Sequence, residues 1–215
     1  MRELAGKTLA PNMSSQALAD RVVEIRNSMS VLPPEVLADR TGAEYLLSED
    51  GIGEFHLPYF GKMIRVDATS PSVYQSDDRE LPAIHQALVA YYFATATGVQ
   101  LANNWVSFSG LPNGRIYAGA FQGYTGDLVA GRVGLNLQSF HEACKKAGGL
   151  LYEMADAAYL FIAFPKFPML LAYWLGDDEF PSTCKVLFDA AACEYLPIDG
   201  CAIAGTVLVK KILNS

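Results

Sequence analysis

The most apolar part of the chain lies between residues 161 and 181. A membrane-spanning helix needs about 20 uninterrupted apolar residues, whereas this stretch contains Pro165, Lys166 and Pro168. A proline inside a helix costs about 3 kcal/mol. The apolar arms 157–164 and 169–175 are short and rich in aromatic and aliphatic residues, a pattern typical of strands buried on both faces. We therefore predict an antiparallel meander over residues 157–190 at the centre of a sheet, with 165–168 as its first connection.

Apolar residues at helical spacing predict helices in the first half of the chain. One helix is expected over 15–29 behind a serine cap, and a short helix over 33–42 is opened by proline and closed by Gly42. A third is expected over 82–97, followed by Gly98. The apolar stripes are Leu18, Val22, Ile25 and Met29 in the first helix, and Ile84, Leu88, Tyr91 and Thr95 in the third.

Turn residues predict the remaining elements. Two strands are expected within 54–67, joined near 60–62, followed by a polar loop over 70–80. Two more are expected on either side of a turn at 111–114. The glycine-rich residues 122–137 indicate a long flexible loop, for which the functional alternative is a lid over a pocket. The remaining expectations are a helix capped by Ser139 and ended at Gly148, and a C-terminal helix over 197–213 with Lys210 and Lys211 in its last turns.

These elements predict the α+β class, an antiparallel sheet built around the C-terminal meander with helices packed on it. We expect a flexible leader over 1–14 and a single domain over 15–215, because 215 residues suit one substantial core. The chain is 51% hydrophobic and 18% charged, which is more apolar than an average soluble domain. This excess of apolar residues predicts a large core, an oligomer interface or a ligand cavity.

The net charge of the chain limits the classes of partner that we expect it to bind. The formal net charge is −7, and nucleic-acid binding draws on clustered lysine and arginine. The N-terminal residues lack the apolar core of a secretory signal. We therefore expect a cytoplasmic protein with a small-molecule ligand and with no nucleic-acid or membrane partner.

No short motif of established chemistry stands out. The sequence contains no nucleophile elbow, P-loop or complete dinucleotide-binding fingerprint. No metal site is predicted, because the histidines are far apart and the cysteines form no CxxC pair. Buried, reduced thiols are the expectation for the cysteines, and a cluster of three sharing a metal is the alternative. The residues concerned are His56, His85, His141, Cys144, Cys184, Cys193 and Cys201.

The candidate ligand site is built on an acidic turn, Asp177, Asp178 and Glu179, between two apolar strands. Such a turn is commonly a solvated hairpin tip. The alternative is that it borders a polar site with Asp189, where carboxylates bind a hard cation or orient a proton. Aromatic walls and an anion partner would complete a small-molecule pocket. The predicted ligand-binding residues are Trp105, Arg115, Tyr117, Trp174, Asp178, Glu179 and Asp189.

Three blocks of the sequence, "NNWVSFSGLPNGRIY", "FPKFPMLLAYWLGDDEFP" and "KVLFDAAACEYLPIDGCAIAG", resemble domain-of-unknown-function family 3786. The likeness covers most of residues 35–205. The family is common in anaerobic bacteria and archaea, and some relatives are joined to a four-cysteine iron–sulfur module like that of corrinoid proteins. The resemblance thus implies work near anaerobic redox or one-carbon metabolism. The first 143 residues here contain no cysteine, so they cannot hold such a cluster.

Three hypotheses of function follow. The first is an accessory protein that binds a small molecule or a redox cofactor such as a corrinoid. The second is a hydrolase or lyase that uses Asp189 and the 177–179 turn, with or without a metal ion. The third is an interaction subunit, whose apolar excess contacts a second copy of the chain or a redox-protein partner. The sequence leaves open whether the protein is an enzyme.

Overall fold

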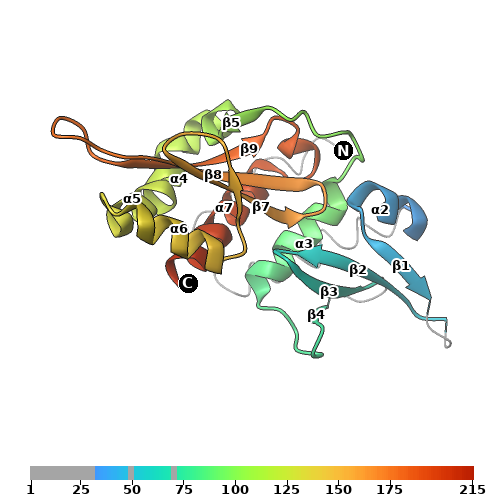
Figure 1. Ribbon diagram of the computed structural model, residues 1–215. Coiled ribbons are helices and arrows are strands. Elements are labelled where there is room, and N and C mark those ends of the chain that lie inside the picture. The colour runs from blue at the N-terminus through green and yellow to red at the C-terminus, as the bar shows by residue number, and fades with distance from the viewer. Residues whose placement is uncertain (1–31, 48–50, 69–71) are drawn as a thin grey trace.

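The computed structural model describes residues 32–47, 51–68 and 72–215, and Figure 1 shows the arrangement of their helices and strands. The leader predicted over 1–14 and the helix predicted over 15–29 lie outside the described residues. The described chain forms two antiparallel sheets accompanied by helices. This architecture confirms the predicted α+β class.

The first sheet precedes the long central helix in the chain and has the strand order β1-β2-β3-β4. Buried and less buried residues alternate along β2, so the sheet turns one face toward the core. The predicted hairpin is confirmed, since Phe60 and Gly61 both have positive φ, at 46° and 78°. Two-residue hairpin loops favour this backbone geometry. The elements are α2 (Pro34–Thr41), β1 (Glu44–Leu47), β2 (Gly53–Tyr59), β3 (Lys62–Asp67) and β4 (Val73–Gln75), of which β4 lies where only a loop was expected.

The second sheet contains the predicted meander and has the strand order β5-β9-β8-β7-β6. Every residue of its central strand β8 except Trp174 is buried, as expected for a strand covered on both faces. The connection before β8 is shorter than predicted, because Phe167 and Pro168 already belong to the strand. The strands are β5 (Trp105–Ser107), β6 (Leu150–Tyr152), β7 (Ala157–Phe164), β8 (Phe167–Trp174) and β9 (Thr183–Asp189).

Helix α3 (Ala83–Thr95) joins the two sheets. The ring of Phe93 lies 5.0 Å from that of Phe55 in β2, and the ring of Tyr92 stacks 4.1 Å from that of Phe164 in β7. Residues 87–93 are all buried. The predicted one-sided apolar stripe therefore understates the burial of this helix, whose residues 87–93 are buried on every side.

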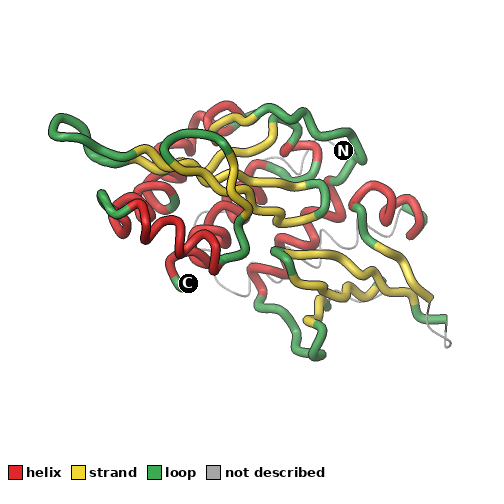
Figure 2. The backbone as a smooth tube through the Cα atoms, in the orientation of Figure 1, coloured by secondary structure: helices red, strands yellow, loops and turns green. Residues whose placement is uncertain are grey.

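Four further helices pack beside the second sheet, as the red segments of Figure 2 show. They are α4 (Ala118–Tyr124), α5 (Gly126–Val133), α6 (Leu137–Lys146) and α7 (Ile198–Leu213). The long C-terminal helix α7 confirms the prediction for 197–213. It approaches α4 closely at Gly205, where a Cβ atom would lie 2.6 Å from the ring of Phe121. Only glycine fits at this position without displacing the ring.

Two predictions for the middle of the chain are wrong. Residues 105–121 do not form a pair of strands, because β5 is followed by the 3₁₀ turns η1 (Phe108–Gly110) and η2 (Gly114–Tyr117) and then by α4. The ring of Phe108 stacks 4.2 Å from that of Phe121, which holds this segment in a compact helical fold. Residues 122–137 are not a long loop, since they contain the end of α4 and all of α5. The lid expected there is therefore absent from these described residues.

The predicted cap of helix α6 is also wrong. The side chain of Asn136 accepts a hydrogen bond from the backbone nitrogen of Ser139 at 3.1 Å, so the cap lies three residues before the predicted one and the helix begins at Leu137. Asparagine is as good a cap as serine, and the sequence contains both within residues 136–139. The geometry chooses Asn136.

The buried apolar side chains form one large cluster that includes Phe55 of the first sheet and Phe188 of the second. A smaller group on the opposite face of the second sheet, which we call the outer cluster, consists of Ala158, Leu170, Ala172 and Leu187. Within the described ranges, no helix has both the length and the apolar character that crossing a membrane requires.

Candidate functional site

A large cavity lined by described residues, which we call the α7 cleft, has a volume of about 1180 Å³. One side consists of the β2–β3 hairpin, the turn after β4 and the start of α3. The other side consists of α7 with residues from the ends of α4 and α5. Pockets for drug-sized ligands usually measure about 300–1,000 Å³. The cleft is therefore large enough for a ligand of cofactor size.

The walls of the cleft are largely apolar. Three of their side chains are partly open to solvent, since Met63, Ile84 and Leu128 are 48%, 37% and 50% exposed. Apolar surface left open in a concave site is available to a ligand. The apolar lining also includes Ile64, Leu81, Ala202, Ile203, Val207, Val209 and Leu213.

The β2–β3 hairpin is held in place by the second sheet. The backbone nitrogen of Phe60 donates to the carbonyl oxygen of Ala163 in β7 at 3.0 Å. The ring of Tyr59 lies 5.1 Å from that of Phe164. These contacts fix the hairpin against a buried strand, so this wall of the cleft is built on rigid elements.

A tyrosine–histidine pair lies in the same wall. The hydroxyl of Tyr59 and Nδ1 of His85 are 2.6 Å apart. Burial raises the pKa of Tyr59, and the pKa of His85 is lowered by burial and by the positive charge of Lys210. Both groups are therefore neutral at pH 7. Because a phenol is a better donor than a neutral imidazole, we infer that Tyr59 donates to Nδ1 and that Nε2 of His85 carries the ring proton.

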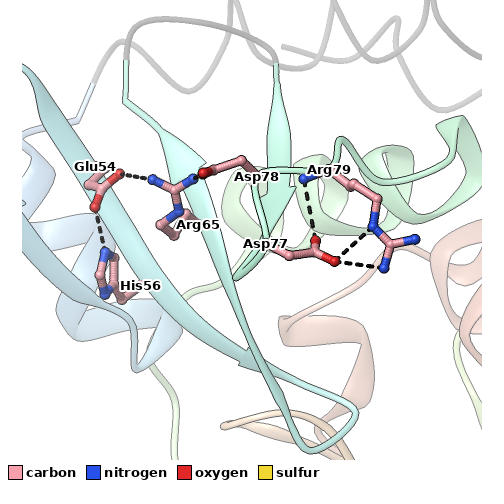
Figure 3. Close-up of polar contacts among 6 residues, drawn as sticks. All are labelled: Glu54, His56, Arg65, Asp77, Asp78 and Arg79. Atoms are coloured by element: carbon pink, nitrogen blue, oxygen red, sulfur yellow. Dashed lines mark hydrogen bonds and ion pairs between the residues drawn. The ribbon is translucent and has the colours of Figure 1, made fainter.

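The charged residues of the cleft are mostly cationic. Asp77 and Arg79 form an exposed ion pair, with Oδ2 of Asp77 2.7 Å from both Nε and Nη2 of Arg79 (Figure 3). The hydrogen bond from Arg79 lowers the pKa of Asp77. The full charged lining is Lys62, Arg79, Lys210 and Lys211 against Asp77 and Asp199. The cleft is thus locally positive in a chain whose formal net charge is −7.

A second charged group lies on the first sheet, at a smaller cavity of about 290 Å³. Figure 3 shows Arg65 between Glu54 and Asp78, with His56 on the far side of Glu54. Arg65 and Asp78 form an ion pair, and Nη1 of Arg65 lies 3.6 Å from Oε2 of Glu54. All four side chains are partly exposed to solvent. We interpret this group as a solvated salt-bridge chain that contributes little to stability.

The structure brings three of the sequence-predicted residues to the outer face of the second sheet. Trp105 and Trp174 both pack against the outer cluster, and Trp105 is the strand partner of Asp189. Nε1 of Trp105 donates to the hydroxyl of Tyr152 at 3.0 Å. Nζ of Lys185 lies 5.8 Å from the ring centroid of Trp174. The two tryptophans cover small buried residues on this face.

Asp189 is buried at the end of β9, with 2% exposure. Its Oδ1 accepts hydrogen bonds from the backbone nitrogens of Ala102 and Ala191, both at 2.9 Å. The carboxylate therefore fastens two loops to the end of the strand. This geometry favours a structural contribution.

The other predicted residues lie elsewhere. Arg115 is exposed, and Tyr117 packs against the large core cluster. Asp178 and Glu179 are exposed in the turn between β8 and β9, which projects from the body in Figure 1. None of the residues predicted to bind a ligand lines either of these two cavities. Their role in binding stays a prediction.

Three of the four cysteines are buried in the structure. Cys144, Cys184 and Cys201 are buried, Cys193 is half-buried, and all four are free thiols. Among the residues that the structure describes, no three or more His, Cys, Asp or Glu side chains are grouped to share a metal ion. The described residues thus give no support to the three-cysteine metal cluster.

Sequence patterns carry only weak signals for the cleft residues. His85 lies one position away from the predicted stripe of its helix, which indicates a histidine at the edge of the core. Lys210 and Lys211 were explained by the helix dipole alone. His85 and these two lysines come together through contacts between α3 and α7. No local sequence pattern encodes that packing.

The chain belongs to the family described as domain of unknown function DUF3786, whose model matches residues 33–211. No curated protein and no solved structure matches the chain. The match confirms the family that the three sequence blocks indicate. An account of function rests on the geometry of the cleft.

Proposed function

We propose that this member of the family binds a small molecule of cofactor size in the α7 cleft. The ligand has a largely apolar body and an anionic group, a carboxylate or a phosphate. One observation carries the proposal: an open apolar cleft of about 1180 Å³ is lined by an excess of cationic side chains in an acidic protein. Apolar walls with a few convergent polar groups are typical of small-molecule sites.

The charged and polar side chains of the cleft have different roles in binding the ligand. Lys62, Lys210 and Lys211 supply positive potential, which raises the local concentration of anions. The inferred Nε2–H of His85 is a neutral donor beside Lys210. The apolar walls contribute affinity through burial of the body of the ligand, at about 25 cal/mol per Å² removed from water before the cost of association.

Binding is favoured over catalysis by the position of Asp189. The enzyme hypothesis needs this carboxylate at a substrate, but it accepts two backbone hydrogen bonds and lies outside the cleft. The proposed role is that of an accessory protein that holds its ligand.

Two cofactor classes suit this chemistry. Cobalamin-type corrinoids and flavin mononucleotide both join a large ring system to a phosphate group. The volume of the cleft supports a ligand of this size, and the family resemblance supports a connection to anaerobic redox or one-carbon metabolism. A ligand present at 100 times its dissociation constant stabilises a protein by about 2.7 kcal/mol. Binding of either cofactor should therefore raise the melting temperature measurably.

The ligand class is tested with two fluorescent probes that differ by one charged group. 8-Anilinonaphthalene-1-sulfonate carries a sulfonate, and N-phenyl-1-naphthylamine is its neutral counterpart. We expect saturable binding of one anilinonaphthalene sulfonate per chain, at least about tenfold tighter than the neutral probe, which corresponds to about 1.4 kcal/mol. Fluorescence titration measures both dissociation constants.

An occlusion variant locates the bound probe. Thr206 lines the cleft on α7, so the indole of Thr206→Trp should obstruct the cleft and weaken saturable binding at least about tenfold. Lys146→Trp places the same ring on an exposed position of α6 and should leave binding unchanged. Equal affinity for the two probes, or full binding to Thr206→Trp, contradicts the proposal.

A further inference from the structure

Helix α7 has two largely apolar faces. The face toward the core is buried, as at Leu208 and Ile212. The opposite face, which we call the cleft face, lines the α7 cleft and is only half-buried at Ala202, Ile203, Thr206 and Val207. A helix face in open water normally carries charged and polar residues. The apolar residues of the cleft face are therefore available to a ligand that lies along the helix.

The cleft face has opposite charges at its two ends. Asp199 lies in the first turn of α7, Lys210 and Lys211 lie in its last turn, and all three line the cleft. Eleven positions separate Asp199 from Lys210, which corresponds to about three turns of the helix and about 16 Å along its axis. The two side chains therefore lie on the same face of α7, one at each end of its apolar stretch.

The helix dipole explains only part of this pattern. An acidic first turn and a basic last turn stabilise any helix, but the dipole gives no reason for half-buried apolar residues between them. The other carboxylate of the lining, Asp77, is bound by Arg79 at 2.7 Å. Asp199 is thus the lining carboxylate outside that ion pair, at the end of α7 away from the lysines.

We propose that the ligand of the α7 cleft is an elongated amphiphile with an anionic group at one end and a hydrogen-bond donor, such as an ammonium group, at the other. This inference rests on the proposed function and adds the second end of the ligand. The anion binds Lys210 and Lys211, the apolar body lies along the cleft face, and the donor binds the carboxylate of Asp199. The Debye length at physiological ionic strength is about 8 Å, so the two ends contribute to affinity independently.

Two probes of equal length, which differ only at the far end, test this assignment. 12-Aminododecanoate has a carboxylate and an ammonium group, whereas dodecanedioate has two carboxylates. An extended chain advances about 1.2 Å per bond, so both probes span about 15 Å. Each probe is titrated into the full-length protein with bound anilinonaphthalene sulfonate, and the loss of fluorescence gives its dissociation constant. We expect 12-aminododecanoate to bind at least about tenfold tighter than dodecanedioate.

A pair of matched variants locates the group that recognises the far end. Asp199→Asn keeps the size of the side chain but removes its charge, and it should abolish the preference for 12-aminododecanoate. Asp127 also lies in the first turn of a helix, α5, but it does not line the cleft. Asp127→Asn should therefore retain the preference.

The outcomes separate this inference from the proposed function. Equal or tighter binding of dodecanedioate, or a preference that survives Asp199→Asn, overturns the inference and leaves the anion-binding cleft in place. Binding of anilinonaphthalene sulfonate that neither long-chain probe displaces also overturns it. Absence of saturable binding of anilinonaphthalene sulfonate overturns the proposed function and this inference together. The wild-type comparison of the two probes decides the matter even if a variant does not fold.

Discussion

Each of the two sheets places a tyrosine hydroxyl against a histidine of a neighbouring helix. In the first sheet Tyr59 of β2 lies 2.6 Å from Nδ1 of His85 in α3, and in the second Tyr159 of β7 lies 2.8 Å from Nδ1 of His141 in α6. The ring centroids are 5.7 Å apart in both pairs. The local contact is thus nearly the same in the two regions.

The surroundings of the two pairs differ. His85 lines the α7 cleft, and Lys210 helps to lower its pKa, whereas His141 lines neither of the two cavities. A hydrogen-bonded histidine is therefore insufficient evidence for a site. An open cavity and a charged neighbour distinguish the candidate binding residue from the structural one.

The largest expected effect is a loss of stability on changing Asp189 in the second sheet, with binding in the cleft retained. Asp189→Ala removes the acceptor of two backbone N–H groups, and hydrogen bonds to charged groups contribute about 1.5–3 kcal/mol each. We expect the free energy of unfolding to fall by about 3 kcal/mol, measured by urea denaturation, with probe binding retained by the folded fraction.

The exposed carboxylate of the acidic turn is the control for this change. Asp178→Ala should alter the free energy of unfolding by less than about 0.5 kcal/mol. If Asp189→Ala keeps full stability and instead abolishes ligand binding, the sequence-based site at the end of β9 is correct and our assignment of the cleft is wrong.

The next largest expected effect is a loss of probe affinity on changing His85, with His141 as the control. His85→Leu should weaken binding of anilinonaphthalene sulfonate by about tenfold, or about 1.4 kcal/mol, because it removes a donor beside Lys210. His141→Leu removes the corresponding contact of the second sheet and should leave the affinity of the folded protein unchanged. Equal losses in the two variants would show that the cleft has no special relation to His85.

The smallest effect is a pH dependence of stability. The pKa of His85 is lowered from its ordinary value of 6.5, so the unfolded chain takes up a proton at higher pH than the folded protein does. Its contribution to stability is full above pH 6.5 and is lost as the pH falls through 6.5 toward the lowered value. Denaturation between pH 5 and 8 should show a shallower decline for His85→Gln than for the wild type. Parallel curves for the two proteins would contradict the shift.

Much of the fold followed from local patterns. The continuous apolar strands β7 and β8, interrupted by Pro165, were predictable because two buried faces leave few polar positions. The helix after Asn113 was missed, since glycine and proline at 110–114 favour a hairpin locally, and the stacking of Phe108 on Phe121 decides otherwise. Packing between distant residues outweighed turn propensity there.

The site was less predictable than the fold. Trp105 and Asp189 are strand partners, but the hydrogen-bond donors to Asp189 are backbone nitrogens, which no sequence pattern displays. The cleft joins Tyr59, His85 and Lys210 from three distant segments. Each of these residues has an ordinary structural explanation when considered alone, and only the three-dimensional arrangement brings them together.

The central claim is that cationic residues of α7 recognise an anion in the cleft, and two lysine pairs provide the most direct measurement. Lys210 and Lys211 lie in the last turn of α7, and Lys145 and Lys146 lie in the last turn of α6, away from the cleft. Both double alanine variants lose two charges at a helix end, so they share the same effect on the helix dipole. We predict that Lys210→Ala/Lys211→Ala abolishes the preference for anilinonaphthalene sulfonate over its neutral counterpart, whereas Lys145→Ala/Lys146→Ala retains it. An unchanged preference in the first variant, or an equal loss in both, would contradict the account.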